Sequence, residues 1–286
     1  MIYVHRDLTK IPQEKLDALK AVSDALDSID DPAMRKAFIE ANRAAWNAVR
    51  SELEAMSFGK CWYTEAKEGC SRYQTDHYRP HGRAKQAAKT YAAGYCWLAF
   101  DIDNYRIVGV LANTQNQEYS VETVGKSDWF PLLDPTSRAT LVNRSTDGEV
   151  PLLLDPVNED HPEKIMFNDN GEAHPSDELS DEEKAWVRDA IDRMGIKQEK
   201  LNGLRRRVWR ECEGRIAKYD RFFKKPSAER TPEDKLSMKE LAGELRAMAS
   251  CRAPFAATAR QCLKSNRLQD LIVKDEYAAA NAAAHA

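Results

Sequence analysis

The spacing of hydrophobic residues changes twice along this 286-residue chain, and that change constrains the fold more than any other feature. In the first sixty residues, apolar side chains recur three and four positions apart, which is typical of a helix with one buried face: Leu16, Leu19, Val22 and Leu26. From Cys61 to about Pro175 the apolar runs are short and are broken by Gly, Pro, Asn and Asp, which favours short strands and loops. Helical spacing returns after residue 180. The pattern predicts an α+β fold that is mostly α-helical.

Helix-start signals place several of the expected helices. Ser180 with Glu183 forms the sequence of a capping box, and Thr231 followed by Pro232 is a second N-terminal signature. A further N-terminal helix is expected after Asp31, with one apolar face made of Met34, Phe38, Ala41, Ala45 and Val49.

These signals divide the chain into four expected parts. An N-terminal helical region, 1–60, precedes a core with a loop-rich extension, 61–178. A C-terminal helical region follows at 179–277. The last part, 278–286, is a low-complexity tail that is either disordered or a cloning remnant.

Composition excludes several classes of protein. No apolar run approaches the roughly 18 residues of a membrane span, and no secretory leader is recognisable, so a cytoplasmic protein without membrane contact is expected. Six irregularly spaced cysteines do not suggest a disulfide scaffold. The net charge of -3 hides an acidic stretch at 147–183 and a basic stretch at 205–225. Such separated charges are either ordinary solvated faces or a surface for a polyanion.

Polar residues suited to catalysis gather in the loop-rich centre. Asp76 and His77 lie at the end of an expected strand, Asn104 follows 27 residues after His77, and Asn113 comes nine residues later. An Asp–His pair alone is weak evidence, because a histidine hydrogen-bonded in a loop has the same appearance. A His, an Asn and a final His or Asn, with eight residues between the last two, are the layout of an HNH, or ββα-metal, nuclease site, and the final position is Asn here.

The order of the surrounding motifs makes that resemblance specific. The chain resembles HNH endonucleases of the PtuB type, known from Septu and retron-associated anti-phage systems. The resemblance rests on Lys60-Cys61-Trp62-Tyr63, Asp76-His77-Tyr78-Arg79-Pro80, Tyr95-Cys96-Trp97-Leu98-Ala99-Phe100-Asp101, Asn104-Tyr105, Asn113, Phe130-Pro131-Leu132 and Leu152-Leu153-Leu154-Asp155-Pro156. It extends into the C-terminal helices through 204–209 and 253–257, and so covers most of the chain.

The resemblance implies a compact ββα-metal core between the helical regions and a role for each site residue. His77 is expected to be the general base, and Asn104 to hold the loop that carries it. Asp76 and Asn113 are expected to bind a divalent metal ion, Mg²⁺ first and Mn²⁺ as the alternative. Asn116 is the alternative ligand if the register is shifted by three residues.

Basic residues follow the histidine closely. Arg79 is expected either to brace the scissile phosphate or to serve as a structural ion-pair partner. Arg83, Lys85 and Lys89 are expected to contact the nucleic-acid backbone. His81, four residues after His77, is expected in a loop, because Pro80 and Gly82 disfavour a helix there.

One departure from many HNH nucleases concerns zinc. Their two CxxC pairs correspond here to Cys61 with Thr64 and to Gly109 with Ala112, so four thiolates are absent and no structural zinc is expected. Packing is expected to replace the zinc, contributed by Trp62, Tyr63, Trp97 and Phe100.

The resemblance also implies partners. These are DNA, with RNA as an alternative, an ATPase subunit of the PtuA type, and in retron systems a reverse transcriptase with its RNA/DNA product. Two other functions remain open: an inactive HNH-fold adaptor that binds nucleic acid, and a structural interaction protein. In the last, Arg205–Arg207 with Trp209 and Arg210 would dock an acidic partner or a nucleic acid, unless they form the solvated side of a helix.

Overall fold

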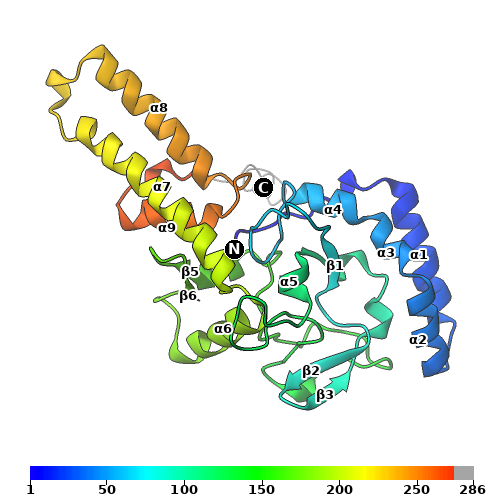
Figure 1. Cartoon of the computed structure of the whole chain (residues 1–286). Coiled ribbons are helices and arrows are strands. Elements are labelled where there is room, and N and C mark those ends of the chain that lie inside the picture. The colour runs from blue at the N-terminus through cyan, green and yellow to red at the C-terminus, as the bar shows by residue number, and fades with distance from the viewer. Residues whose placement is uncertain (274–286) are drawn as a thin grey trace.

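The computed structural model describes residues 1–273 and confirms the predicted α+β class with mostly helical content (Figure 1). The expected tail at 278–286, with the end of the C-terminal region at 274–277, lies outside the described residues. Within residues 1–273, no helix combines the length and apolar character needed to cross a membrane. Seven short 3-10 helices connect the main elements: η1 Leu8–Lys10, η2 Cys96–Leu98, η3 Ile102–Asn104, η4 Pro135–Ser137, η5 His161–Lys164, η6 Ser227–Glu229 and η7 Gln269–Leu271.

The N-terminal region is built from α1 Gln13–Asp27, α2 Pro32–Ala41, α3 Ala44–Ala48 and α4 Arg50–Met56. The single apolar face expected after Asp31 is therefore wrong, because the run is divided between α2, α3 and the turn at Val49, and Met34 is 63% exposed. The physical reason is local. The Asn42 side chain donates to the carbonyl of Phe38 at 2.8 Å and so competes with continuation of α2.

The centre contains a small ββα unit. Strand β1, Gln74–His77, pairs antiparallel with β4, Tyr105–Val108, and the register sets His77 opposite Tyr105. Helix α5, Val110–Asn113, follows β4 directly and packs against β1. The remaining described strands form two antiparallel hairpins. One pairs β2, Arg83–Ala87, with β3, Thr90–Ala93, and the other pairs β5, Ile165–Phe167, with β6, Ala173–Pro175.

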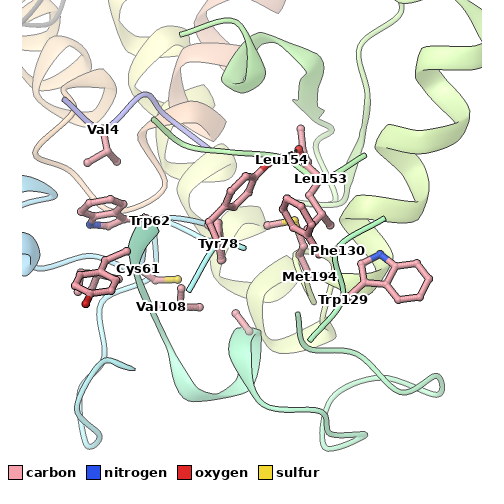
Figure 2. Packing of buried hydrophobic residues seen from close by; sticks show 14 of the residues in the cluster. Val4, Cys61, Trp62, Tyr78, Val108, Trp129, Phe130, Leu153, Leu154 and Met194 are labelled. Atoms are coloured by element: carbon pink, nitrogen blue, oxygen red, sulfur yellow. Dashed lines mark hydrogen bonds between the residues drawn. The ribbon is translucent and has the colours of Figure 1, made fainter. Parts of the chain in front are cut away.

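A continuous hydrophobic core joins the N-terminal helices to this unit. Figure 2 shows Trp62, Tyr78 and Phe130 packed among aliphatic side chains, and each is at most 3% exposed. Phe100 meets the N-terminal helices edge-on at Phe38. All four aromatic residues that were expected to replace a zinc site are buried: Trp62, Tyr63, Trp97 and Phe100.

The C-terminal helices are α6 Asp181–Arg193, α7 Glu199–Phe223, α8 Pro232–Ala249 and α9 Ala256–Ser265. The predicted capping box of Ser180 with Glu183 is confirmed at the start of α6, and Thr231 caps α8. In Figure 1, α7 and α8 run side by side and project away from the rest of the molecule.

Two long-range contacts of charged residues hold the C-terminal helices against the core. The buried Lys60 ammonium donates to the carbonyls of Cys251 and Ala253, which lie between α8 and α9. Arg205 was predicted to be a docking or solvated residue, and this prediction is wrong. It is 1% exposed, donates to the Ile196 carbonyl and lies over the ring of Phe167, because α7 turns this side chain into the core.

Candidate active site

An open cavity of about 330 Å³ lies between β1, the loop that follows it, and α5. Four of the sequence-predicted site residues line it: Asp76 and His77 from the end of β1, Asn113 from the end of α5, and Arg83 from the start of β2. Antiparallel pairing with β4 brings α5 back beside β1, so residues nearly forty positions apart meet in one cavity.

The His77 ring is fixed by a hydrogen bond to the main chain. Its Nε2 lies 2.8 Å from the carbonyl oxygen of Ala99, and because a carbonyl can only accept, Nε2 carries the proton. The Nδ1 atom is therefore the unprotonated nitrogen, and no side chain or main-chain group among residues 1–273 donates to it. This tautomer leaves a lone pair on a ring that lines the cavity.

The surroundings keep the His77 ring uncharged. Burial, followed by the charges of His81 and Lys126, lowers the pKa of His77 to about 3. Trp46 and Tyr105 meet the ring edge-on at 4.9 and 5.2 Å between centroids. A phosphate anion in the cavity favours the protonated form and raises this pKa toward the range that a general base needs.

Asn104 ties together the segment that follows the histidine. Its Oδ1 accepts from the main-chain N–H of Arg79 at 2.8 Å, and its Nδ2 donates to the Arg79 carbonyl at 2.9 Å. Nδ2 also donates to the carbonyl of Leu98. Asn104 does not line the cavity, and its contacts are those of a residue that holds the loop. His81 lies in this loop, as predicted, with its ring 4.6 Å from that of His77.

The Asp76 carboxylate has two partners in the protein interior. Tyr63 donates its hydroxyl hydrogen to Oδ2 at 2.8 Å, and Lys126 donates to Oδ1 at 3.1 Å and to the His77 carbonyl at 2.9 Å. Lys126 is completely buried. Sequence reasoning missed this lysine, because a lone lysine between Gly125 and Ser127 gives no local signal and its partners lie about fifty positions earlier.

Replacing Tyr63 with phenylalanine is expected to lower the free energy of unfolding by about 2 kcal/mol, because the buried carboxylate loses a hydrogen bond. Urea denaturation of wild type and Tyr63→Phe measures the difference. Tyr91→Phe is the matched control, since Tyr91 is 45% exposed on β3. Equal stability of wild type and Tyr63→Phe would mean that Asp76 does not depend on this donor.

Asn113 and Asp76 are side chains at the cavity that could hold a small, hard cation. Asn113 donates from Nδ2 to Gln74 at 2.9 Å, and its Oδ1 is buried without a hydrogen-bond partner among residues 1–273. That unsatisfied oxygen and the Asp76 carboxylate are oxygen groups of the type that Mg²⁺ prefers as ligands. No cluster of three or more His, Cys, Asp or Glu suited to a metal occurs among the described residues. Asn116 lies outside the cavity, where its amide donates to the carbonyls of Leu111 and Thr114.

Of the two roles expected for Arg79, the structure shows the structural ion pair. Its Nε donates to Glu149 at 2.8 Å, and the Glu149 side chain is completely buried. Tyr95 and the main-chain N–H of Ala139 also donate to Glu149. Arg79 does not line the cavity.

The other predicted basic residues lie on the β2–β3 hairpin. Arg83 pairs with Asp128 at 2.6 Å and lies over the Tyr91 ring, although its side chain is 63% exposed. Lys85 lies over the Trp129 ring, and the exposed Lys89 occupies the turn of the hairpin with a φ of 61°. Of the three, only Arg83 borders the cavity.

Three of the positions that the resemblance aligned with zinc ligands, Cys61, Thr64 and Gly109, lie together. The buried Cys61 thiol is hydrogen-bonded with Thr64 and the main chain at Gly109, and burial raises its pKa. One thiol among these residues does not supply the four ligands of a structural zinc site.

The comparisons with known proteins give one informative likeness. No family model matches the chain. The chain is 30% identical over 132 residues to the Septu protein PtuB of Bacillus mycoides (strain KBAB4). It resembles a Septu protein. The matched part covers 43% of this chain and 40% of that relative, so this chain matches less than half the length of the Septu protein. The likeness supports the Septu-type relationship that the motif order predicted.

Proposed function

We propose that this chain is a metal-dependent HNH endonuclease that hydrolyses phosphodiester bonds, DNA first and RNA as the alternative. One observation carries the proposal. His77, fixed through Nε2 with Nδ1 unprotonated, lines the same cavity as the Asp76 carboxylate and the unsatisfied Oδ1 of Asn113. A base beside two oxygen ligands is what metal-assisted hydrolysis requires.

Each residue then has a task in the proposed reaction. His77 Nδ1 accepts a proton from the water that attacks phosphorus in line with the leaving oxygen. Asn104 and the Ala99 carbonyl hold the ring and its loop in place. Asp76 and Asn113 would hold the divalent cation, which when bound supplies positive charge at the leaving oxygen. Arg79, paired with Glu149, keeps the loop in place and does not contact substrate in this proposal.

The proposed biological setting comes from the likeness to the Septu protein. We place the chain as the effector of an anti-phage system that works with an ATPase subunit of the PtuA type. A retron reverse transcriptase with its RNA/DNA product is a further proposed partner.

A second candidate function is favoured by one contact. Lys126 places an ammonium group on Oδ1 of Asp76, where it competes with a cation for that oxygen. This contact favours an HNH-fold subunit that binds nucleic acid without cutting it. Such a subunit shows salt-sensitive binding and no divalent-dependent cleavage.

Removal of the metal tests the choice between the two functions. Supercoiled plasmid and single-stranded DNA are incubated with the protein in Mg²⁺, in Mn²⁺ or in a chelator. We expect cleavage with either ion and none with the chelator. Cleavage that continues in the chelator would contradict the proposed role of the metal.

The ligand assignment is tested by Asn113→Ala. We expect the Mg²⁺ concentration for half-maximal cleavage to rise by at least about tenfold, because one oxygen ligand is lost. Asn116→Ala is the matched control, since its amide lies three residues away and outside the cavity. If Asn116→Ala changes the Mg²⁺ requirement and Asn113→Ala does not, the ligand assignment is reversed.

A further inference from the structure

A second cavity adjoins the candidate active site. It has a volume of about 620 Å³ and lies between α2 and the start of the β2–β3 hairpin. His81, Gly82 and Arg83 line both cavities, so the two cavities are neighbours along this segment. Its volume is within the roughly 300–1,000 Å³ range of small-molecule sites.

An unsatisfied guanidinium group lines this second cavity. Arg35, on α2, is only 5% exposed, yet its Nε and Nη1 have no hydrogen-bond partner among residues 1–273. Its single hydrogen bond is a long one of 3.5 Å from Nη2 to the Asp27 carbonyl. A buried positive charge without an anion lowers the stability of the fold, and no described residue supplies an anion for Arg35. The planar N–H donors of arginine match a phosphate group.

The rest of the lining provides charge and apolar surface. Lys36 lies one position after Arg35 and borders the cavity without an ion pair in the described chain. Glu40, the one acid in the lining, is paired with Arg43. Ile39 and Leu141 add apolar surface that suits the face of a base.

We propose that this cavity binds one unpaired nucleotide of the substrate strand next to the cleaved bond, with Arg35 binding its phosphate. The inference rests on the proposed nuclease function for the identity of the strand. A nucleotide enters such a recess only when it is unstacked, which a single strand allows at little cost and a continuous duplex does not. The preferred substrate is therefore a strand with an unpaired nucleotide beside the cleavage site.

Binding without catalysis tests the inference. Fluorescence anisotropy measures the affinity of the whole chain for a short labelled single strand and for the matching duplex, in a chelator so that no cleavage occurs. We expect Arg35→Met to weaken single-strand binding about tenfold and Arg35→Lys to weaken it less, because charge is kept. Lys20→Met is the matched control, since Lys20 is an exposed lysine of α1 that pairs with Asp24.

Two further measurements separate a binding role from a structural one. Without nucleic acid, Arg35→Met is expected to melt no lower than wild type, because it removes a buried charge that has no partner. Leu141→Trp, which fills the cavity from its other side, is expected to weaken single-strand binding while leaving Arg35 in place.

Several outcomes overturn the inference. The first is an Arg35→Met variant whose affinity for the single strand equals that of wild type. The second is a loss of affinity for the duplex as large as the loss for the single strand. The third is deoxyadenosine monophosphate binding to wild type as tightly as the single strand, which would indicate a site for a free nucleotide. Failure of the nuclease function gives a different result. In that case wild type never cleaves, while single-strand binding still depends on Arg35.

Discussion

Cleavage by the His77→Ala variant is expected to be about 10²- to 10⁴-fold slower than cleavage by wild type, which is the usual contribution of a general base. The imidazole has its proton on Nε2, bonded to the Ala99 carbonyl, and Nδ1 is the nitrogen left to take a proton from water. His81 is the other histidine in the cavity lining, with its ring 4.6 Å from that of His77, and among residues 1–273 no main-chain group holds its ring as Ala99 holds that of His77. The rate of nicking of supercoiled plasmid at saturating Mg²⁺ measures the effect.

The matched control is His174→Ala. His174 lies on β6, outside the cavity, and its ring Nδ1 is 3.0 Å from the carbonyl oxygen of Pro175. Its removal is expected to leave the cleavage rate unchanged. Equal rates for wild type and His77→Ala, with both proteins folded by circular dichroism, would show that His77 is not the base. If neither protein cleaves, the comparison is repeated with the ATPase subunit proposed above as a partner.

The Arg106→Met variant is expected to lose about 3–5 kcal/mol of stability, because it leaves a buried carboxylate without its cation. Arg106, on β4 and opposite Asp76 in the strand register, forms two hydrogen bonds of 2.7 Å with Asp155. Both residues are at most 9% exposed. Chemical denaturation followed by fluorescence measures the loss.

A surface pair provides the control for that variant. Asp103→Asn breaks the ion pair with Arg6, in which the aspartate side chain is 63% exposed, and is expected to cost less than about 1 kcal/mol. The double variant Arg106→Met/Asp155→Leu is expected to recover part of the loss, because no charge is then left unpaired. A loss in Arg106→Met no larger than that in Asp103→Asn would contradict the importance of the buried pair.

The same pair gives stability a dependence on pH. Although burial alone would raise the pKa of Asp155, the charge and hydrogen bonds of Arg106 hold it below its usual value of 3.8. A carboxyl whose pKa is lowered by folding stabilises the protein above its unfolded pKa. That contribution is lost as the pH falls through the folded value.

Sequence alone was sufficient for features that depend on nearby residues. The capping box at Ser180 and the cap at Thr231 were predictable because each partner lies three positions away. The meeting of Asp76, His77 and Asn113 in one cavity followed only from the family resemblance, because neither composition nor periodicity pairs β1 with β4.

The roles of several charged residues could not be predicted from the sequence, because they depend on contacts between distant positions. Lys126 reaches Asp76 across fifty positions, and Arg79 reaches Glu149 across seventy. Arg205 had the pattern of a surface arginine, yet the packing of α7 against the core buries it. The role of a buried charged residue depends on the groups that it contacts, and these groups come close to it only when the chain folds.

The contact of Lys60 with the main chain at Cys251 and Ala253 has a consequence for synthesis of the protein. A ribosome releases the ββα unit long before it releases those carbonyls, and until then the lysine has no acceptors for the charge that the fold must bury. Packing of the Lys60 segment against the C-terminal helices is therefore completed only after residues 251–253 have been synthesised.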